Sequence, residues 1–325
     1  MTRTIWLNGS IVDPVSAAVS TSDAGLQHAV GLFETMLAQA TDAQPQGRVF
    51  RLAEHLARLA TSARELGLMS SLNTRALAEA VEATLERSGI CSIDEPTSTR
   101  ARVRLTITGG DLNMLAAART PGASQTPQHD PTILIDVSPA QRYPDAMFDR
   151  GVSLVVAAAK ANPLNQFESH KTLNYWWRLR ELQLAASKGA GETLVLMVTN
   201  HVAGGAVSNL FAVKDRRLIT PIVRGEEQPA AIPSPVLPGV TRAAVVTFAD
   251  ALGIPVEKRM LTIDDALDAD ELFLTNSSWG VLPVARVEAK PIGPGGDGDS
   301  TNQTSPGPIT IQLRKHWLDA MADEL

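Results

Sequence analysis

The chain has 325 residues, of which 44% are hydrophobic and 20% are charged, and its formal net charge is -6. This composition is typical of a globular protein, and the length favours two lobes over a single core. The negative charge and the lack of basic clusters argue against nucleic acid or an anionic membrane as the main partner.

The N-terminal stretch MTRTIWLNGSIVDP is polar at Asn8, Gly9 and Asp13 and then reaches Pro14. It therefore cannot form the apolar core of a secretory signal. No apolar run reaches the length that spans a membrane. We expect a cytoplasmic protein.

Cysteine and histidine usage argues against a metal centre. Cys91 is the only cysteine, which excludes an internal disulfide and a thiolate cluster. No pair among the six histidines has metal-ligand spacing. We expect no metal.

In the N-terminal half, residues 51–66 predict an amphipathic helix that ends at Gly67. Its apolar stripe consists of Leu52, Leu56, Leu59, Ala63 and Leu66. Residues 73–88 predict a second helix ending at Gly89. A strand is expected over residues 102–108, followed by a polar stretch through residue 130 and a strand over residues 132–137.

We place a domain boundary near residue 140, which gives a domain of residues 1–140 and a larger one of residues 141–325. In the second, strands over residues 192–198, 209–215 and 271–275 alternate with helices over residues 171–187 and 241–252. Residues 293–308 are rich in Gly, Pro, Ser and Thr and predict a mobile loop.

Two turns could bind an anion. In LPGVTR, a tight Pro238-Gly239 turn precedes a helix, so the amides of Val240 and Thr241 point toward one spot. The alternative is an ordinary capped helix. A second turn, TNSSWG at residues 275–280, offers clustered hydroxyl and amide donors.

Lys171 begins the aromatic, leucine-containing stretch KTLNYWW. At a helix start in an apolar setting, the helix dipole and desolvation would both lower the pKa of its ammonium. A neutral amine is what a Schiff base requires. A lysine, an anion site and the expected absence of metal together indicate a pyridoxal phosphate enzyme. The alternative is a lysine that extends to solvent.

Seven segments occur in the order found in one enzyme family: LNG (7–9), SDAGLQHAVGLFETM (22–36), FRLAEHLARLATSARELGL (50–68), KTLNY (171–175), VSNLFAV (207–213), LPGVTR (237–242) and NSSWGVLPV (276–284). The sequence resembles the fold-type IV (class IV) pyridoxal phosphate enzymes, which include branched-chain and D-amino acid aminotransferases and 4-amino-4-deoxychorismate lyase. The resemblance implies a two-domain α+β fold. The smaller N-terminal lobe is α/β, the larger C-terminal lobe has a barrel-like sheet, and the cofactor lies between the lobes of a homodimer.

The same resemblance assigns roles to individual residues. It makes Lys171 the Schiff-base lysine and proton shuttle, and it places Tyr175 near the phenolic oxygen of pyridoxal 5'-phosphate. The cofactor phosphate would be bound by Arg51, Val240, Thr241 and Ser277. A guanidinium such as that of Arg51 can bind a phosphate through two hydrogen bonds.

Two departures from the family pattern bear on activity. Gly204 stands where relatives have the glutamate that pairs with the pyridine nitrogen of the cofactor, and its loss should weaken carbanion stabilisation. Glu192 matches a different family position, for which we expect a structural role. His28 replaces an aromatic residue on the substrate side, and it is either a general base or a polar core residue.

Three functions remain open from the sequence. The first is an aminotransferase acting on an amino acid and a 2-oxo acid. The second is a lyase of the aminodeoxychorismate type, since NSSWGVLPV resembles the turn of the lyases. The third is a degenerate relative with weak or no turnover, for which Gly204 and His28 are the reason. Arg104 either faces a substrate carboxylate or lies exposed on its strand.

Overall fold

The computed structural model describes residues 3–91, 99–111, 131–293 and 306–323. The chain divides into two compact units. Unit 1 comprises Met1–Gln141, His170–Asn174 and Glu324–Leu325, and unit 2 comprises Arg142–Ser169 and Tyr175–Asp323. The sequence boundary near residue 140 assigns Lys171 to the C-terminal domain, whereas the contacts of residues His170–Asn174 assign it to unit 1.

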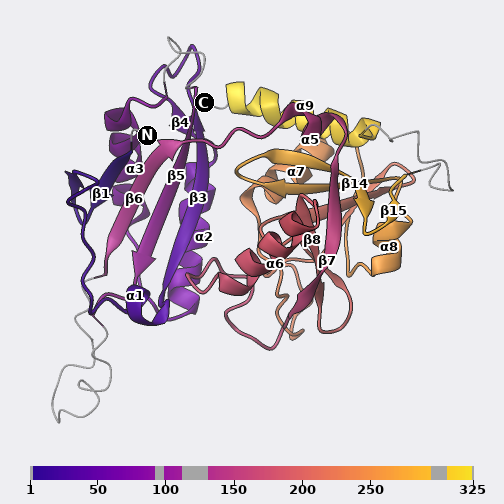
Figure 1. Cartoon of the computed structure of the whole chain (residues 1–325), viewed down its shortest axis with the longest axis horizontal. Helices are drawn as coiled ribbons and strands as arrows, with labels where there is room; N and C mark the ends of the chain where they lie inside the picture. Colours follow the sequence, from indigo (N-terminus) through magenta and orange to yellow (C-terminus); the bar gives the residue numbers. More distant parts are fainter. Residues whose placement is uncertain (1–2, 92–98, 112–130, 294–305, 324–325) are drawn as a thin grey trace. The chain divides into compact units, whose positions relative to one another are not determined.

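Unit 1 is built on a six-stranded antiparallel sheet with the order β2-β1-β6-β5-β3-β4 (Figure 1). Its strands are β1 (Thr4–Leu7), β2 (Ser10–Val12), β3 (Gly31–Gln39), β4 (Arg48–Val49), β5 (Arg100–Thr108) and β6 (Ile133–Pro139). Side chains alternate between the two faces of a strand. In β5, Val103, Leu105 and Ile107 are fully buried, while Arg102 and Arg104 alternate with them on the other face.

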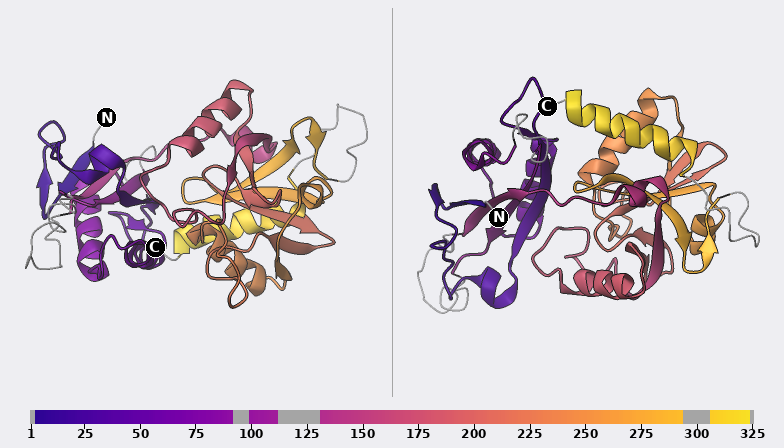
Figure 2. Two further views of the ribbon diagram at one scale, coloured as in Figure 1. Left: turned by 90° about the horizontal axis from the view of Figure 1, so that it is seen from below. Right: turned by 45° about the horizontal axis from the view of Figure 1, so that its top comes forward.

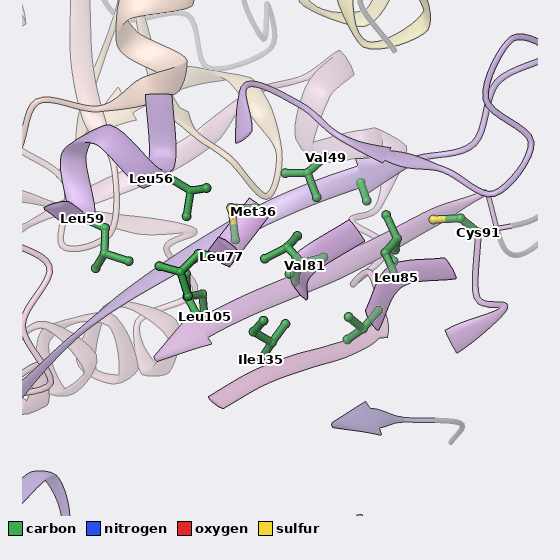
Figure 3. Packing of buried hydrophobic residues seen from close by; sticks show 14 of the residues in the cluster. Met36, Val49, Leu56, Leu59, Leu77, Val81, Leu85, Cys91, Leu105 and Ile135 are labelled. Atoms are coloured by element: carbon green, nitrogen blue, oxygen red, sulfur yellow. The ribbon is translucent and has the colours of Figure 1, made fainter. Parts of the chain in front are cut away.

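Helices cover one face of this sheet. Among the described residues, the helices of unit 1 are α1 (Ala24–His28), α2 (Leu52–Glu65) and α3 (Thr74–Ser88). Leu56 and Leu59 of α2 and Val81 of α3 pack against Met36 and Leu105 of the sheet (Figure 3). The periodic apolar stripe that predicted α2 is therefore the side of that helix that packs in the core of unit 1.

The lysine-bearing segment pairs with the free part of one edge of β3. On that edge, β4 pairs only with Ala38 and Gln39. Farther along, the Phe33 amide donates to the Lys171 carbonyl at 2.9 Å, and the Leu173 amide donates to the Gly31 carbonyl at 2.9 Å. This pairing is the reason why the segment belongs to unit 1.

Unit 2 contains a nine-stranded mixed sheet with the order β12-β11-β10-β13-β14-β7-β8-β9, in which β15 also pairs with β14. Its strands are β7 (Val152–Ala161), β8 (Glu192–Met197), β9 (Val202–Gly204), β10 (Asn209–Lys214), β11 (Arg217–Thr220), β12 (Val256–Lys258), β13 (Glu271–Asn276), β14 (Gly280–Val287) and β15 (Lys290–Pro291). Strand β9 also lies against β10, so the sheet curls on itself. All six residues of β8 are buried, as expected for a strand that is covered on both faces.

The helices of unit 2 are α5 (Asp145–Asp149), α6 (Trp176–Ser187), α7 (Val240–Ala251), α8 (Ile263–Leu267) and α9 (Pro308–Asp323). Helix α6 packs on β7 and β8, while α7 and α9 lie side by side and contact β13 (Figure 2). Most of the loop predicted over residues 293–308 lies outside the described residues. No helix in the described ranges is both long enough and apolar enough to cross a bilayer.

Candidate functional site

Lys171 lies in an extended segment, and the prediction that it begins a helix is wrong. Helix α6 begins at Trp176, and Thr172 forms a bridge with Leu32 of β3. The aromatic and leucine residues that follow the lysine do form a helix, but backbone pairing with β3 keeps the preceding residues extended. The prediction from a helix dipole therefore does not apply to Lys171.

The amine of Lys171 lies against an aromatic ring of unit 1. Its Nζ is 4.4 Å from the centroid of the Phe33 ring, and the Cζ of Arg104 is 3.9 Å from the same centroid. An aromatic face attracts cations through its quadrupole. Phe33 thus brings the amine and a guanidinium to one ring, on the face of the sheet opposite the helix-packed core.

A buried charge cluster that the sequence analysis missed lies on the other face of β3. The Glu34 carboxylate accepts hydrogen bonds from His55 Nδ1 at 2.7 Å and from Arg58 Nε at 2.9 Å and Nη2 at 2.6 Å. Glu34 and His55 have 1% exposed side chains, and Arg58 has 10%. The cluster places one buried carboxylate next to one guanidinium and one imidazole.

The pKa values of this cluster follow from burial and pairing. Burial alone would raise the pKa of Glu34, but Arg58 and His55 outweigh it and bring that pKa to about 2. Burial lowers the pKa of His55, and the charges of Arg58 and Lys171 lower it further, against the opposing effect of Glu34. The charge of Lys171 is therefore felt at the cluster.

Arg51 occupies the N-cap position of α2 with a left-handed backbone, φ 52° and ψ 44°. This conformation is uncommon for a residue other than glycine. The side chain is 16% exposed, and its Nη1 is 3.6 Å from Glu54 Oε1. Arg51 is thus held at the start of α2 in unit 1, the unit that also contains Lys171.

His28 is the last residue of α1 and is exposed. The reading of His28 as a polar core residue is wrong, because α1 is a single short turn on which only Ala24 is buried. Its proposed role as a base has no hydrogen-bond partner among the described residues to support it.

Helix α7 begins in unit 2 with the turn that the sequence singled out. Gly239 is its N-cap, and Val240 and Thr241 form its first turn. A Cβ on Gly239 would overlap the side-chain oxygen of Asn209, and the Asn209 Nδ2 donates to the Leu237 carbonyl at 2.9 Å. Glycine is required for this close approach, which leaves the amides of the first helical turn available to an anion.

The second polar turn follows β13. The side-chain oxygen of Asn276 accepts hydrogen bonds from the amides of Ser278 at 2.9 Å and Trp279 at 3.1 Å, so Ser277 lies at the tip of the turn. Next to it, the Thr275 hydroxyl is buried, and no partner for it is found among the described residues. Both hydroxyls belong to a segment that the sequence marked as a candidate anion site.

Gly204 ends β9 and begins a turn through Ser208. Its φ is 133°, and a Cβ there would lie 2.7 Å from the Ser208 carbonyl oxygen. Any side chain at this position would be strained. The backbone conformation at this position therefore favours glycine.

Glu192 stabilises that turn from β8. One carboxylate oxygen accepts from the amides of Thr193 at 2.9 Å and Ala206 at 3.2 Å. The other accepts from the Val207 amide at 3.3 Å and the Ser208 hydroxyl at 3.2 Å. Burial raises the pKa of Glu192, and these hydrogen bonds partly oppose it. The carboxylate is committed to the protein backbone, as the sequence analysis expected.

Two asparagines connect the three turns of unit 2. Asn209 reaches the turn before α7, and Asn276 Nδ2 donates to the Val207 carbonyl at 3.4 Å. Asn209 and Thr275 are direct partners in the β10–β13 ladder. The turns at residues 204–208, 237–241 and 275–280 therefore lie at one edge of one sheet. Both asparagines stand in motifs noted in the sequence, but their linking role needed the fold.

Tyr175 directly precedes α6 at its N-cap position in unit 2. The Arg178 Cζ is 5.8 Å from the Tyr175 ring centroid, and Arg178 Nη2 donates to Glu168 at 2.9 Å. Of the predicted site residues, Lys171, Arg51 and His28 lie in unit 1, and Tyr175, Gly204, Val240, Thr241 and Ser277 lie in unit 2. No cluster of three potential metal ligands occurs within the residues that the structure describes.

Comparison with known proteins identifies the family. The profile of the amino-transferase class IV family matches residues 31–287. The chain belongs to this family. It is 29% identical, over 97% of its length and 95% of the relative, to a putative branched-chain-amino-acid aminotransferase of Methanocaldococcus jannaschii.

Solved structures of family members share the fold. The Escherichia coli branched-chain amino acid aminotransferase is 26% identical with a TM-score of 0.81, over 99% of this chain and 95% of that one. The 4-amino-4-deoxychorismate lyase of Pseudomonas aeruginosa is 25% identical with a TM-score of 0.73, over 97% and 98%. The predicted fold class, a two-lobe α+β fold of type IV, is confirmed, and so is the prediction of a class IV aminotransferase.

Enzymes of this family use pyridoxal phosphate, and the residues present fit that group. In unit 2, the turn at Gly239 exposes the first amides of α7, and the second turn carries the hydroxyls of Thr275 and Ser277. Such amides and hydroxyls are donors suited to a phosphate. In unit 1, a lysine amine suited to an aldehyde lies over an aromatic ring.

Proposed function

We propose that this class IV aminotransferase moves an amino group between a branched-chain amino acid and a 2-oxo acid, with Lys171 as the reactive amine. The observation that carries the proposal is the fixed position of Lys171: its backbone pairs with β3 and its Nζ lies over Phe33. The substrate class is supported by relatives that match nearly the whole chain and are named branched-chain aminotransferases.

Bound pyridoxal phosphate would supply an aldehyde for the amino group and a ring that accepts the electron pair of the broken C–H bond. Lys171 would accept that proton on Nζ and donate it back later in the reaction. Phe33 would keep the amine on one face of the sheet. Arg51, the amides of Val240 and Thr241, and the Ser277 hydroxyl would bind the phosphate, and Tyr175 would face the phenolic oxygen.

Arg104 is our candidate for binding a substrate carboxylate. It lies over the same ring as the Lys171 amine, which places a guanidinium and the reactive group on one side of β3 and β5. A guanidinium binds a carboxylate through two parallel hydrogen bonds. We expect Arg104→Leu to raise the KM for amino acids much more than it lowers kcat, and an unchanged KM would remove Arg104 from the substrate site.

The first test is the absorption spectrum of the protein with pyridoxal phosphate, across pH, for the wild type, Lys171→Ala and the control Lys188→Ala. Lys188 is exposed after α6, so its variant controls for the loss of one lysine. A visible band of the covalent adduct in the wild type and the control, absent from Lys171→Ala, is expected. A band that persists in Lys171→Ala would contradict the assignment.

The second test concerns the reaction. With the adduct established, branched-chain amino acids should convert the cofactor to its amine form, and a 2-oxo acid should convert it back. Arg51→Ala should weaken cofactor binding by roughly ten- to a hundredfold while leaving the adduct band at saturation. Unchanged cofactor affinity would remove Arg51 from the phosphate site.

The alternative is a lyase of the aminodeoxychorismate type. It is favoured by the turn NSSWGVLPV and by the likeness to the Pseudomonas aeruginosa lyase over nearly the whole chain. Pyruvate release from aminodeoxychorismate without an added 2-oxo acid would establish it and displace the aminotransferase proposal. A cofactor spectrum that responds to neither substrate class would favour the third hypothesis, a relative with weak or no turnover.

The variant Gly204→Glu, which would supply the glutamate expected from the family pattern, is not a simple test of what Gly204 does to activity. The positive φ and the nearby Ser208 carbonyl would strain Gly204→Glu, so its failure would have a structural cause. The pH dependence of the cofactor spectrum is more direct. Without a carboxylate beside it, the pyridine nitrogen should lose its proton at lower pH than in relatives that carry the glutamate.

We also propose that the protein is a cytoplasmic homodimer and that it has no nucleic acid or membrane partner. The net charge of -6 supports the second statement, because a phosphate-rich partner would be repelled. Light scattering during size-exclusion chromatography would measure the oligomeric state, and a monomer at micromolar concentration would contradict the first. Cell fractionation would test the location.

A further inference from the structure

Helix α2 has a row of polar residues beside its apolar stripe. His55, Arg58, Ser62 and Glu65 follow one another at spacings of three and four, so they lie on one side of the helix. We call these four residues the polar row. His55 and Ser62 are buried, with relative exposures of 1% and 5%. Such burial is unusual for polar side chains and indicates partners inside unit 1.

The polar row has two groups of partners. Its first half, His55 and Arg58, binds Glu34 of β3, as described above. Its second half binds His170, the residue directly before the reactive lysine. The His170 Nδ1 is hydrogen-bonded to Ser62 Oγ at 2.9 Å, and its Nε2 is 3.7 Å from Glu65 Oε2. The His170 side chain is 2% exposed.

The direction of Lys171 depends on this contact. Side chains alternate along an extended segment, so His170 and Thr172 point to one side and Lys171 points to the other. The bridge between Leu32 and Thr172 places His170 and Thr172 on the helix-covered side of β3. Lys171 accordingly lies on the side of Phe33. If the pairing of this segment with β3 shifted by one residue, Lys171 would point toward the helix-covered side, and His170 and Thr172 would point toward the side of Phe33.

Backbone and side-chain contacts hold the segment in this register. Two backbone hydrogen bonds join it to β3, and hydrogen bonds between backbones do not by themselves select which side chains face which side. The residue before His170, Ser169, has a positive φ of 65°, a conformation that its surroundings must impose. The His170–Ser62 hydrogen bond is specific to the observed register, because no other residue of the segment carries an imidazole.

We propose that His170 is a positioning residue for Lys171: its hydrogen bond to Ser62 of the polar row fixes the register in which the lysine amine faces Phe33 and not helix α2. This inference rests on the proposed role of Lys171 as the reactive amine. It adds a residue and a helix face to which neither the sequence nor the family resemblance assigned a role.

The charged groups around His170 make the pH a useful variable. Glu65 of α2 lies 3.7 Å from its Nε2, the Glu34–His55–Arg58 cluster lies on the same helix-covered side of β3, and Lys171 follows it in the chain. A variant that frees the segment should therefore change the pH profile of Lys171 reactivity, and not only the overall stability of unit 1.

The test compares four variants. His170→Leu keeps much of the side-chain volume and removes both polar contacts, and Ser62→Ala removes the partner. His170→Asn keeps a polar atom near the position of Nδ1 and should preserve the bond to Ser62. Arg64→Ala is the control, because Arg64 is exposed on α2 outside the polar row.

The main readout is the labelling of lysines in the unliganded protein by a small amine-reactive reagent, followed by peptide mass spectrometry across pH, with Lys188 as the internal reference. We expect the labelling of Lys171 relative to Lys188 to fall roughly tenfold in His170→Leu and Ser62→Ala, the change expected for one lost buried hydrogen bond. In His170→Asn and Arg64→Ala it should remain close to wild type.

Equal labelling and an equal pH profile of Lys171 in all five proteins would overturn the proposal. If His170→Leu fails to show a cooperative melting transition, Ser62→Ala and His170→Asn decide the question. The rate of adduct formation with pyridoxal, which lacks the phosphate, is the second readout. If the wild type forms no adduct with pyridoxal phosphate, the proposed function fails, whereas the labelling still tests the positioning role.

Discussion

Two buried glutamates show how the same side chain can be kept inside the protein in opposite ways. Glu34 in unit 1 is paired with a guanidinium and an imidazole, and its pKa falls to about 2. Glu192 in unit 2 is paired with backbone amides and a hydroxyl, and its pKa is raised because burial prevails. A full opposite charge offsets desolvation, whereas dipoles do so only in part.

The difference corresponds to two tasks. Glu34 holds α2 to β3 beside the lysine-bearing segment, so it belongs to the framework that orients a reactive amine. Glu192 closes the turn at residues 204–208, which begins at Gly204. The Glu34 carboxylate is part of an electrostatic cluster. The Glu192 carboxylate accepts hydrogen bonds from backbone amides of β8 and of the turn.

The largest effect is expected from Arg58→Met, which leaves the Glu34 charge buried without its guanidinium. Removing one partner of a buried ion pair typically costs about 3–5 kcal/mol. The free energy of unfolding from urea denaturation would measure this loss, with the exposed Arg64→Met as the matched control. A loss of less than about 1 kcal/mol would mean that Glu34 is protonated in the folded protein and that the comparison with Glu192 fails.

Acid should reveal the opposite signs of the two carboxylates. The lowered pKa of Glu34 stabilises the fold above pH 4.5, and this contribution, on the order of 3 kcal/mol, should be lost as the pH falls from 4.5 toward 2. The raised pKa of Glu192 has the reverse effect, because its contribution is complete below the unfolded pKa and is lost as the pH rises. Unfolding free energies of Glu34→Gln and Glu192→Gln from pH 3 to 8, each compared with wild type, should therefore diverge with opposite slopes.

A smaller effect is expected from Gly205→Ala, which crowds the Glu192 turn. Its Cβ would overlap the Ser208 hydroxyl and lie 3.0 Å from Glu192 Cδ. Overpacking of this kind costs about 1–3 kcal/mol. Thermal unfolding of Gly205→Ala and of the double variant with Ser208→Ala would test the cause, since removing the hydroxyl should recover part of the loss. No recovery would place the strain elsewhere.

The smallest effect is expected from Glu192→Gln at neutral pH. The side-chain NH2 of the new glutamine would face a backbone N–H of Val207 or Thr193, and two donors cannot form a hydrogen bond. One or two hydrogen bonds would therefore be lost, at about 1 kcal/mol each. Urea denaturation at pH 7 would measure it, with the exposed Glu82→Gln as control. A loss as large as that of Arg58→Met would show that Glu192 also depends on a full charge.

The sequence predicted much of the local structure. The apolar stripe of residues 52–66 and the stop at Gly67 predicted α2, and the alternation in residues 102–108 predicted β5, because both patterns record which side chains are buried. It did not predict the polar row of α2. Charged residues beside an apolar stripe look the same whether they face solvent or a buried carboxylate, and Glu34 comes from a strand that only the fold brings near.

By itself, the sequence determined the family, the cofactor class and the candidate lysine, because these depend on residue types in a fixed order along the chain. Only the tertiary structure decided that Lys171 lies in an extended segment paired with β3, and that His170 and Thr172 occupy the opposite side of that segment. The physical reason is that the register of a strand is set by its partner, and the partners of this segment, β3 and α2, are remote from it in the chain.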